Sequence, residues 1–260
     1  MELPIFQVDA FADAVFRGNP ASICPLESWL SDETMQAIAA ENNQSETAFL
    51  VPAGDAYEIR WFTPAVEIDL AGHPTLAAAY VIFTILDPSR TEIRFESQRS
   101  GTLVVTRAEG RLLMDFPSHP PKPRDDLGDV AGALGAPPAE ILAARDGVAV
   151  FQTEQQVRAL APDMAKIAAL PVFGLIATAP GETCDFVSRF FAPGAGIPED
   201  PVTGSAHCTL TPYWARKLGR NALHARQISR RGGDLYCRLD GERVEIAGEA
   251  VLYMDGRIHI

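Results

Sequence analysis

The sequence has few cysteines and no long apolar run. Its 260 residues include only four cysteines, Cys24, Cys184, Cys208 and Cys237, and no two of them form a CxxC pair. Dispersed cysteines of this kind are typical of reduced thiols in a cytoplasmic protein. The longest apolar stretch, from Thr75 to Leu86, is too short to cross a bilayer. The first residues also lack the basic and apolar segments of a signal peptide, so we expect a cytoplasmic protein without a membrane partner.

Basic residues are scarce as well. The chain has 22 Lys and Arg against 34 Asp and Glu, which gives a formal net charge of −12, and no run of Lys or Arg occurs. A surface of this charge repels a polyanion at long range, which argues against nucleic acid or an anionic membrane as a partner. A single site can still be locally positive, so a small anionic ligand stays possible.

Several motifs of familiar enzyme classes are missing. No GxGxxG follows a strand and no Walker loop occurs, so nothing supports the binding of a nucleotide or of NAD. The five histidines and four cysteines show no metal-ligand spacing, and we expect no metal site. A GxSxG elbow is also missing, and Ser205 and His207 are too close in sequence to face each other as hydrolase partners.

The most informative feature of the sequence is an internal repeat. Residues 60–64 read RWFTP and residues 189–193 read RFFAP, and each is followed by an acid, a glycine turn and an apolar helix. In this alignment Gly72 matches Gly204, and the segment 100–113 matches 232–245 at the same offset. Three similar segments in one order predict a duplication that joins two homologous halves near the proline-rich stretch 116–126.

The fold class predicted from this pattern is α+β, with two pseudo-symmetric domains. We expect an N-terminal half over 1–117, to which the last strand, about 250–260, can return, and a C-terminal half over 118–260. Each half reads as a strongly curved, mostly antiparallel sheet wrapped around one apolar helix, which lies over 75–86 in the first half. Ser31 is the expected N-cap of an amphipathic surface helix, and a hairpin is expected to turn at Glu109-Gly110.

Glycine turns precede both apolar helices, whose predicted starts are Gly72-His73-Pro74 and Gly204-Ser205-Ala206. A helix N-terminus carries unpaired N–H groups and a partial positive charge, and glycine lets a ligand approach them closely. Two such starts at a cleft shared by the halves could bind a small carboxylate or stabilise an enolate-like anion. Both turns could also be helix starts with no other role.

Titratable residues lie close to these turns. Glu46, which begins the apolar run ETAFLV, is expected to be partly buried, and burial would raise its pKa toward neutrality and suit it to proton transfer. From the residues alone, Glu46 could instead be an exposed loop acid, and Asp69 and Asp200 could be turn or capping residues. His73 could be a structural histidine, and Ser205 could be an N-cap.

Taken together, six segments of the chain resemble the phenazine-biosynthesis (PhzF-like) isomerase family, which has the diaminopimelate-epimerase-like fold. The segments are VDAF, FRGNPA, ENNQSETAFLV, RWFTPAVEIDLAGHPTLAAA, DPVTGSAHCTL and QISRRGG. The resemblance implies an active site between two similar domains, proton transfer without a cofactor, and a homodimer. It places the general acid/base on Glu46, the assisting residues on His73, Asp200 and Ser205, the substrate-facing glycines on Gly72 and Gly204, and a further substrate contact on Asn19.

The type member of this family isomerises a dihydro-hydroxyanthranilate, but membership does not fix the substrate. As a hypothesis, Glu46 takes a proton from an acidic C–H, the helix starts and His73 stabilise the charge, and the proton returns at another carbon. Epimerases of the same fold use two opposed cysteines, and neither glycine turn contains one. Two alternatives stay open, an epimerase or racemase that uses Glu46 opposite Asp200, and a non-catalytic member that binds a ligand or a protein partner.

Overall fold

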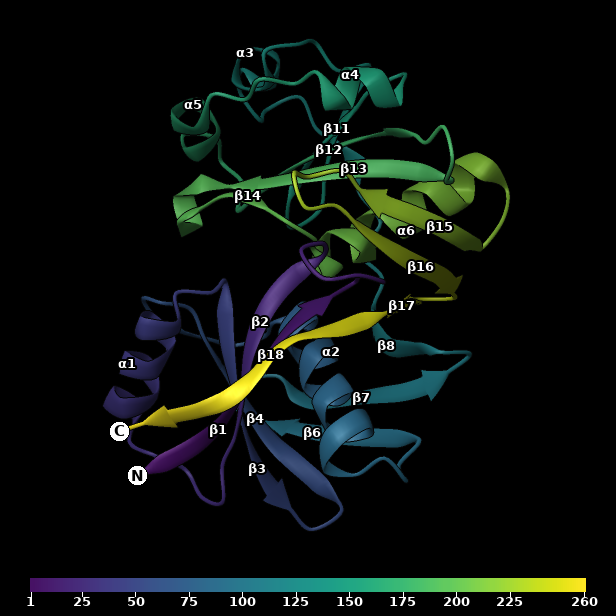
Figure 1. The fold of residues 1–260 in the computed structure, drawn as a ribbon. Coiled ribbons are helices and arrows are strands. Elements are labelled where there is room, and N and C mark those ends of the chain that lie inside the picture. The colour runs from purple at the N-terminus through teal and green to yellow at the C-terminus, as the bar shows by residue number, and fades with distance from the viewer. The chain divides into compact units, whose positions relative to one another are not determined.

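The structure, a computed structural model, describes residues 1–260 and divides into two compact units. Unit 1 comprises Met1–Asp115 and Ala247–Ile260, and unit 2 comprises Phe116–Ile246. In each unit, strands surround one buried helix, α2 (Gly72–Val81) in unit 1 and α6 (Gly204–Leu218) in unit 2 (Figure 1). No helix combines the length and the apolar character that crossing a bilayer would need.

Unit 1 carries most of its strands before α2 and a hairpin after it. Its strands are β1 (Glu2–Ala10), β2 (Asn19–Pro25), β3 (Glu46–Ala53), β4 (Ala56–Phe62), β5 (Glu67–Ile68), β6 (Glu92–Ser97), β7 (Gly101–Ala108), β8 (Arg111–Pro117, at the unit boundary) and β18 (Ala250–His259). Its other helical elements are α1 (Asp32–Asn42) and the π-helical turn η1 (Ile82–Leu86).

Unit 2 repeats the order of the strands around α6, with different short helices between them. Its strands are β9 (Lys122–Pro123), β10 (Glu140–Ala143), β11 (Gly147–Val150), β12 (Leu175–Pro180), β13 (Phe186–Ala192), β14 (Ile197–Asp200), β15 (Ala222–Gln227), β16 (Gly233–Asp240) and β17 (Arg243–Gly248, at the unit boundary). Its short helices are α3 (Val130–Leu134), α4 (Glu154–Arg158), α5 (Met164–Ala168) and the 3₁₀ turn η2 (Pro193–Ala195).

The strand pairing of unit 1 recurs in unit 2, element for element. The antiparallel pair β1–β2 has its counterpart in β10–β11, and the parallel pair β2–β3 in β11–β12. The parallel pair β4–β6, whose strands flank α2 in sequence, corresponds to β13–β15, whose strands flank α6. The duplicated, mostly antiparallel α+β architecture predicted from the internal repeat is therefore confirmed.

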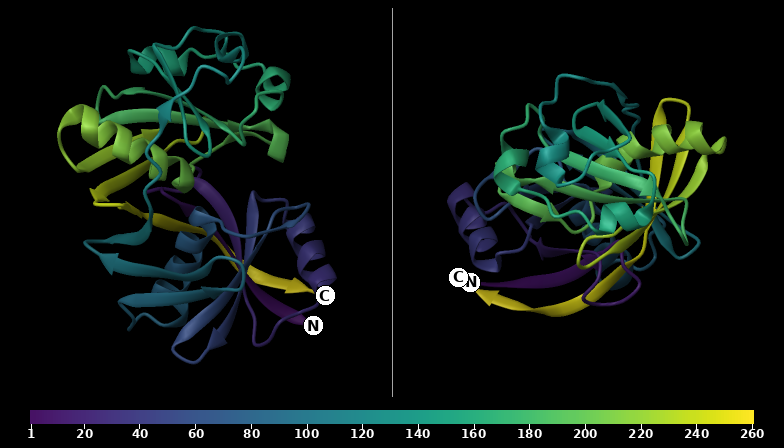
Figure 2. Two further views of the ribbon diagram at one scale, coloured as in Figure 1. Left: turned by 180° about the vertical axis from the view of Figure 1, so that it is seen from behind. Right: turned by 90° about the horizontal axis from the view of Figure 1, so that it is seen from above.

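The two units differ in the source of the strand beside their first hairpin. β18 follows unit 2 in sequence, yet it pairs antiparallel with the whole of β1, from Glu2 opposite His259 to Ala10 opposite Ala250. The N-terminal amine of Met1 donates to the carbonyl of Ile260, so the two chain ends lie side by side (Figure 2). In unit 2 the equivalent position beside β10 is taken by β9, which comes directly after the unit 1 strands.

The buried helix of unit 1 is shorter than its apolar pattern predicts. The residues of α2 from His73 to Ala79 are all buried, as expected for a helix enclosed by strands. The prediction that the enclosed helix continues to Leu86 is wrong, because the chain turns into η1, where Ile85 and Leu86 are each 40% exposed. An apolar sequence pattern shows which residues are present, but it does not show where the strands that cover the helix end.

The buried helix of unit 2 contains a proline, Pro212, in its interior. Proline has no N–H, so the carbonyl four residues earlier, that of Cys208, has no partner within the helix. The backbone N–H of His119 donates to this carbonyl at 2.9 Å and satisfies it. On the same helix, the indole of Trp214 stacks on Phe186 with ring centroids 5.6 Å apart, which fixes the helix against β13.

Two local predictions are confirmed in unit 1. Ser31 is the N-cap of α1, and its Oγ accepts the N–H of Thr34 at 3.2 Å. The hairpin between β7 and β8 turns at Glu109 and Gly110, both of which have positive φ angles, as a tight two-residue turn requires.

Candidate active site

Glu46 and His73 are brought together in unit 1 by a strand and a helix. Glu46 is the first residue of β3 and lies opposite Ala21 in the parallel pairing with β2, and His73 is the second residue of α2. Both side chains are buried, and Nε2 of His73 lies 3.1 Å from Oε2 of Glu46.

The surroundings of His73 fix how its ring is protonated. Burial lowers the pKa of His73 to about 3, and a hydrogen bond with the backbone of Pro20 opposes this effect only in part. Proline has no N–H, so the Pro20 carbonyl accepts this bond, and because Nε2 faces Glu46, Nδ1–H is the donor. A neutral ring then turns the lone pair of Nε2 toward Oε2 of Glu46, and this buried nitrogen has no hydrogen-bond partner within the protein. Nε2 is therefore placed to accept a proton next to the carboxyl group.

The starts of α2 and α6 differ from those of the four other α-helices. Side chains cap α1, α3, α4 and α5, through Ser31, Asp129, Thr153 and Asp163 respectively. Neither α2, which starts after Ala71, nor α6, which starts after Thr203, has a side-chain cap. The first N–H groups of these two helices therefore have no capping side chain. The positive end of each helix dipole lies at the same place.

Asp200 is held by a network inside unit 2. Its buried carboxylate accepts the hydroxyl of Thr203 at 2.5 Å. The Gln227 amide donates to the Asp200 carbonyl at 2.7 Å and to the Thr203 hydroxyl at 3.1 Å, and it accepts the Thr203 N–H at 2.9 Å. Because the Thr203 hydroxyl is turned to Asp200, it cannot cap the helix that follows it.

Ser205 is exposed and is the second residue of α6, so it lies within the helix and is not its N-cap. The guanidinium Nη2 of Arg145 donates to its Oγ at 3.1 Å. Arg145 comes from the turn between β10 and β11, and the sequence analysis did not include it. No local motif marks it, since its contact with Ser205 spans sixty positions of sequence.

The remaining predicted positions are a buried amide, two glycines and a surface acid. Asn19 is fully buried at the start of β2, where its Oδ1 accepts the hydroxyl of Ser45, the neighbour of Glu46, at 3.4 Å. Gly72 and Gly204 are the first residues of α2 and α6. Asp69 is exposed and pairs with Arg99 at 3.0 Å. It is a surface residue, in line with the alternative interpretation of Asp69 as a turn residue.

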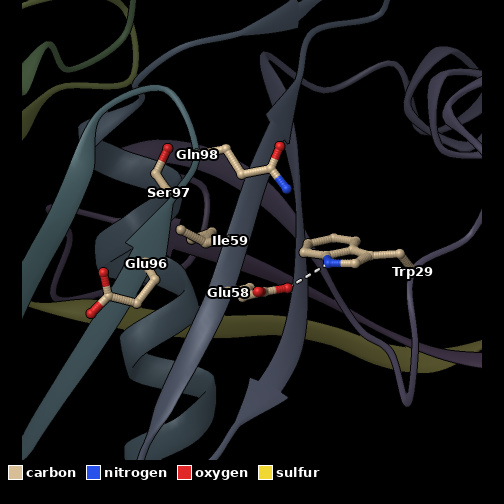
Figure 3. A pocket seen from close by; sticks show the side chains of 6 residues that line it. All are labelled: Trp29, Glu58, Ile59, Glu96, Ser97 and Gln98. Carbon is tan, nitrogen blue, oxygen red and sulfur yellow. Dashed lines mark hydrogen bonds between the residues drawn. The ribbon is translucent and has the colours of Figure 1, made fainter.

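Unit 1 also has a hollow that none of these residues lines. It is lined by Trp29, Glu58, Ile59, Glu96, Ser97 and Gln98, none of which is a predicted site residue (Figure 3). The indole N–H of Trp29 donates to Glu58 at 2.6 Å, and the guanidinium of Arg60 covers the indole ring. The indole N–H of Trp29 and the carboxylate of Glu58 therefore already have each other as hydrogen-bond partners. In the whole chain, no three His, Cys, Asp or Glu side chains gather in a way that could hold a metal ion.

Comparison with known proteins places the chain in a family. Residues 8–256 match the family described as phenazine biosynthesis-like protein. The chain belongs to the phenazine biosynthesis-like family. A relative from Pseudomonas aeruginosa, which bears the name uncharacterized isomerase, is 52% identical to this chain over 261 residues. The alignment covers both chains in full.

Solved structures agree with this placement in the phenazine biosynthesis-like family. A PhzF-family protein of Enterococcus faecalis has 45% identity and a TM-score of 0.97, with each chain covered in full. A hydroxyproline epimerase of Agrobacterium vitis has 10% identity and a TM-score of 0.62, with 99% of this chain and 92% of that chain covered. This distant likeness shows the fold alone, which is that of the diaminopimelate-epimerase-like proteins.

Within each unit, the structure assembles part of the predicted set. In unit 1, Glu46 and His73 are in contact beside the start of α2, and Asn19 accepts a hydrogen bond from Ser45, the residue before Glu46. In unit 2, Asp200 and Ser205 flank the start of α6. That the two groups serve one substrate stays a prediction.

Proposed function

We propose that this protein is an isomerase that moves a proton within a small carboxylate substrate, by general acid/base catalysis and without a cofactor, as PhzF-like enzymes do. The observation that carries the proposal is the buried contact of 3.1 Å between Glu46 and His73 at the uncapped start of α2. A buried carboxylate beside the lone pair of a neutral imidazole can take a proton from a C–H group and later return it.

In the proposed reaction, the carboxylate form of Glu46 removes a proton from a carbon next to an electron-withdrawing group. The electrons of the broken C–H bond move into the substrate, and the negative charge is stabilised by the free N–H groups at the start of α2. Once Glu46 has taken the proton, its O–H can donate to Nε2 of His73, whose ring is fixed by the Pro20 carbonyl. Glu46 then delivers the proton to a different carbon, which shifts the double bond.

The known relatives support the class of reaction. The Pseudomonas aeruginosa relatives are named isomerases, and the distant structural neighbour is an epimerase, a protein that also moves a proton at carbon. An epimerase that uses Glu46 and Asp200 is the second candidate, and the shared fold favours it. A two-thiol mechanism is disfavoured because Cys208, the cysteine next to the second glycine turn, is buried inside α6.

The proposal extends to unit 2 through the family resemblance. We assign Asp200, Ser205 and the backbone at Gly204 to substrate positioning, with the residues at the start of α2 supplying the proton chemistry. A homodimer and a cytoplasmic location belong to the same proposal. Sedimentation of the purified protein and fractionation of cells that express it at natural level are the direct tests.

The deciding experiment is proton exchange in deuterated buffer, followed by NMR, over a panel of cyclic and amino-acid-like carboxylates. A substrate of the isomerase gains deuterium and shifts its double bond, and a substrate of an epimerase gains deuterium at a stereocentre without such a shift. Glu46→Gln removes the base, so exchange should fall by about 10²–10⁴-fold. The matched control is Glu58→Gln, which changes a carboxylate in the Trp29 hollow and should exchange at the wild-type rate. Full exchange by Glu46→Gln would reject the proposed function.

A further inference from the structure

Arg145 is bound to the protein along only one edge of its guanidinium group. Its Nε and Nη2 face the carboxylate of Asp146, with Nη2 at 2.9 Å from Oδ2. Nη2 also donates to Ser205 at 3.1 Å. No hydrogen bond uses Nη1, and 52% of the Arg145 side chain is exposed. Two N–H donors of a fixed cation are therefore open next to Ser205.

Asp146 anchors this cation to the fold. Its side chain is only 1% exposed, and the backbone N–H of Gly174 also donates to it. On the other side, the guanidinium lies over the ring of Phe173, 4.9 Å from the ring centroid. The planar group is thus held by a buried carboxylate on one edge and an aromatic ring on one face. Its orientation is set before any ligand arrives, so binding costs it little side-chain entropy.

The contact from Arg145 also orients Ser205. Because Nη2 donates to Oγ, one acceptor position of the hydroxyl is filled, and its O–H is left as a donor. Ser205 lies in the first turn of α6, where no side chain caps the N–H groups. All the open groups around this point are therefore donors: Nη1 of Arg145, the hydroxyl of Ser205 and the backbone at the helix start.

We propose that Arg145 is a specificity-determining residue that binds the carboxylate group of the substrate, with Ser205 as the second donor. This inference rests on the proposed function and names the group that unit 2 recognises. A carboxylate accepts two parallel hydrogen bonds, one from Nη1 of Arg145 and one from the Ser205 hydroxyl, whereas a neutral carboxamide offers only one acceptor oxygen and no charge. The exposed ring of Phe173 beside the cation provides an apolar contact for the rest of such a ligand.

The test is a ligand pair, anthranilate and its uncharged carboxamide, titrated by calorimetry against wild-type protein and variants. Wild-type protein should bind the acid at least about tenfold more tightly than the amide, since a charged hydrogen bond contributes about one factor of ten or more. Arg145→Gln should bring the ratio close to one. Arg145→Lys keeps a cation beside Asp146 and so protects the fold, and it should give an intermediate ratio because lysine lacks the planar edge.

The matched control is Arg238→Gln in β16, which removes another half-exposed arginine that pairs with a carboxylate, Glu245, and it should leave the ratio unchanged. An undiminished preference for the acid in both Arg145 variants would overturn the proposal, as would a wild-type protein that binds neither compound or binds both equally. Glu46→Gln separates the two proposals. It should keep the wild-type ratio while proton exchange is lost, so exchange without acid preference rejects only the role of Arg145.

Discussion

The starts of α2 and α6 are equivalent positions in a duplicated fold, yet the side chains beside them make different contacts. At α2 the carboxyl group of Glu46 and the imidazole of His73 face each other at 3.1 Å. At α6 the carboxylate of Asp200 is engaged by Thr203, and the exposed hydroxyl of Ser205 is engaged by Arg145. We propose that the first start carries the proton chemistry and that the second presents fixed donors to the substrate. The duplicated fold thus has two equivalent helix starts with different side chains beside them.

The largest effect should come from separating Glu46 and His73. Glu46→Gln and His73→Asn should each lower kcat/KM by about 10²–10⁴-fold, because each removes one member of the pair to which we assign the proton transfer. The asparagine amide can replace Nδ1 as the donor to the Pro20 carbonyl, which protects the fold. The double variant should be about as slow as the slower single variant, since residues that act as a unit are not additive. Losses that multiply in the double variant would show that the two side chains act independently.

The second effect is on acid stability, and it compares the buried histidines of the two helices. Burial lowers the pKa of His73 to about 3 and that of His207, in α6, to about 4. As pH falls below about 6.5, the unfolded chain binds protons that the folded chain does not, so the free energy of unfolding decreases by about 1.4 kcal/mol per pH unit for each histidine. The loss should end near pH 4 for His207 and near pH 3 for His73.

Urea unfolding between pH 7 and pH 4 measures this decrease. His73→Asn and His207→Asn should each make the free energy of unfolding less dependent on pH. The exposed His259, whose side chain is 74% exposed, serves as the control, and His259→Asn should leave the slope as it is in the wild-type protein. An equal slope in all four proteins would mean that the buried rings do not govern acid stability.

The smallest of these effects should come from the amide that holds the start of α6. Gln227→Ala leaves the buried N–H of Thr203 and the carbonyl of Asp200 without their partner, and unsatisfied buried groups cost about 1–3 kcal/mol of unfolding free energy. Gln36→Ala is the matched control, because Gln36 makes one partly buried bond, to the carbonyl of Thr63. Urea unfolding should show the larger loss for Gln227→Ala, and the reverse order would contradict the network described for unit 2.

The sequence predicts the fold and picks out Glu46 and His73, which the structure brings into contact, but it does not point to Arg145. The repeated segments carry the architecture, because each repeat contains its own strand, glycine turn and helix. Glu46 and His73 stand out because a carboxyl group opens an apolar strand and an imidazole opens an apolar helix. Arg145 could not be found in this way, since it meets Ser205 only after the turn between β10 and β11 has formed. The exposed end of η1 was missed because sheet boundaries depend on tertiary packing.

The return of β18 to β1 has a consequence for the order in which the molecule can be built. Residues 250–259 leave the ribosome after every residue of unit 2, so β1 lacks its long neighbour until unit 2 has been synthesised. During that interval the hydrogen-bonding groups along one edge of β1 face water, and such an edge can recruit a strand from another nascent chain. Completion of unit 1 thus depends on synthesis of a strand that follows unit 2.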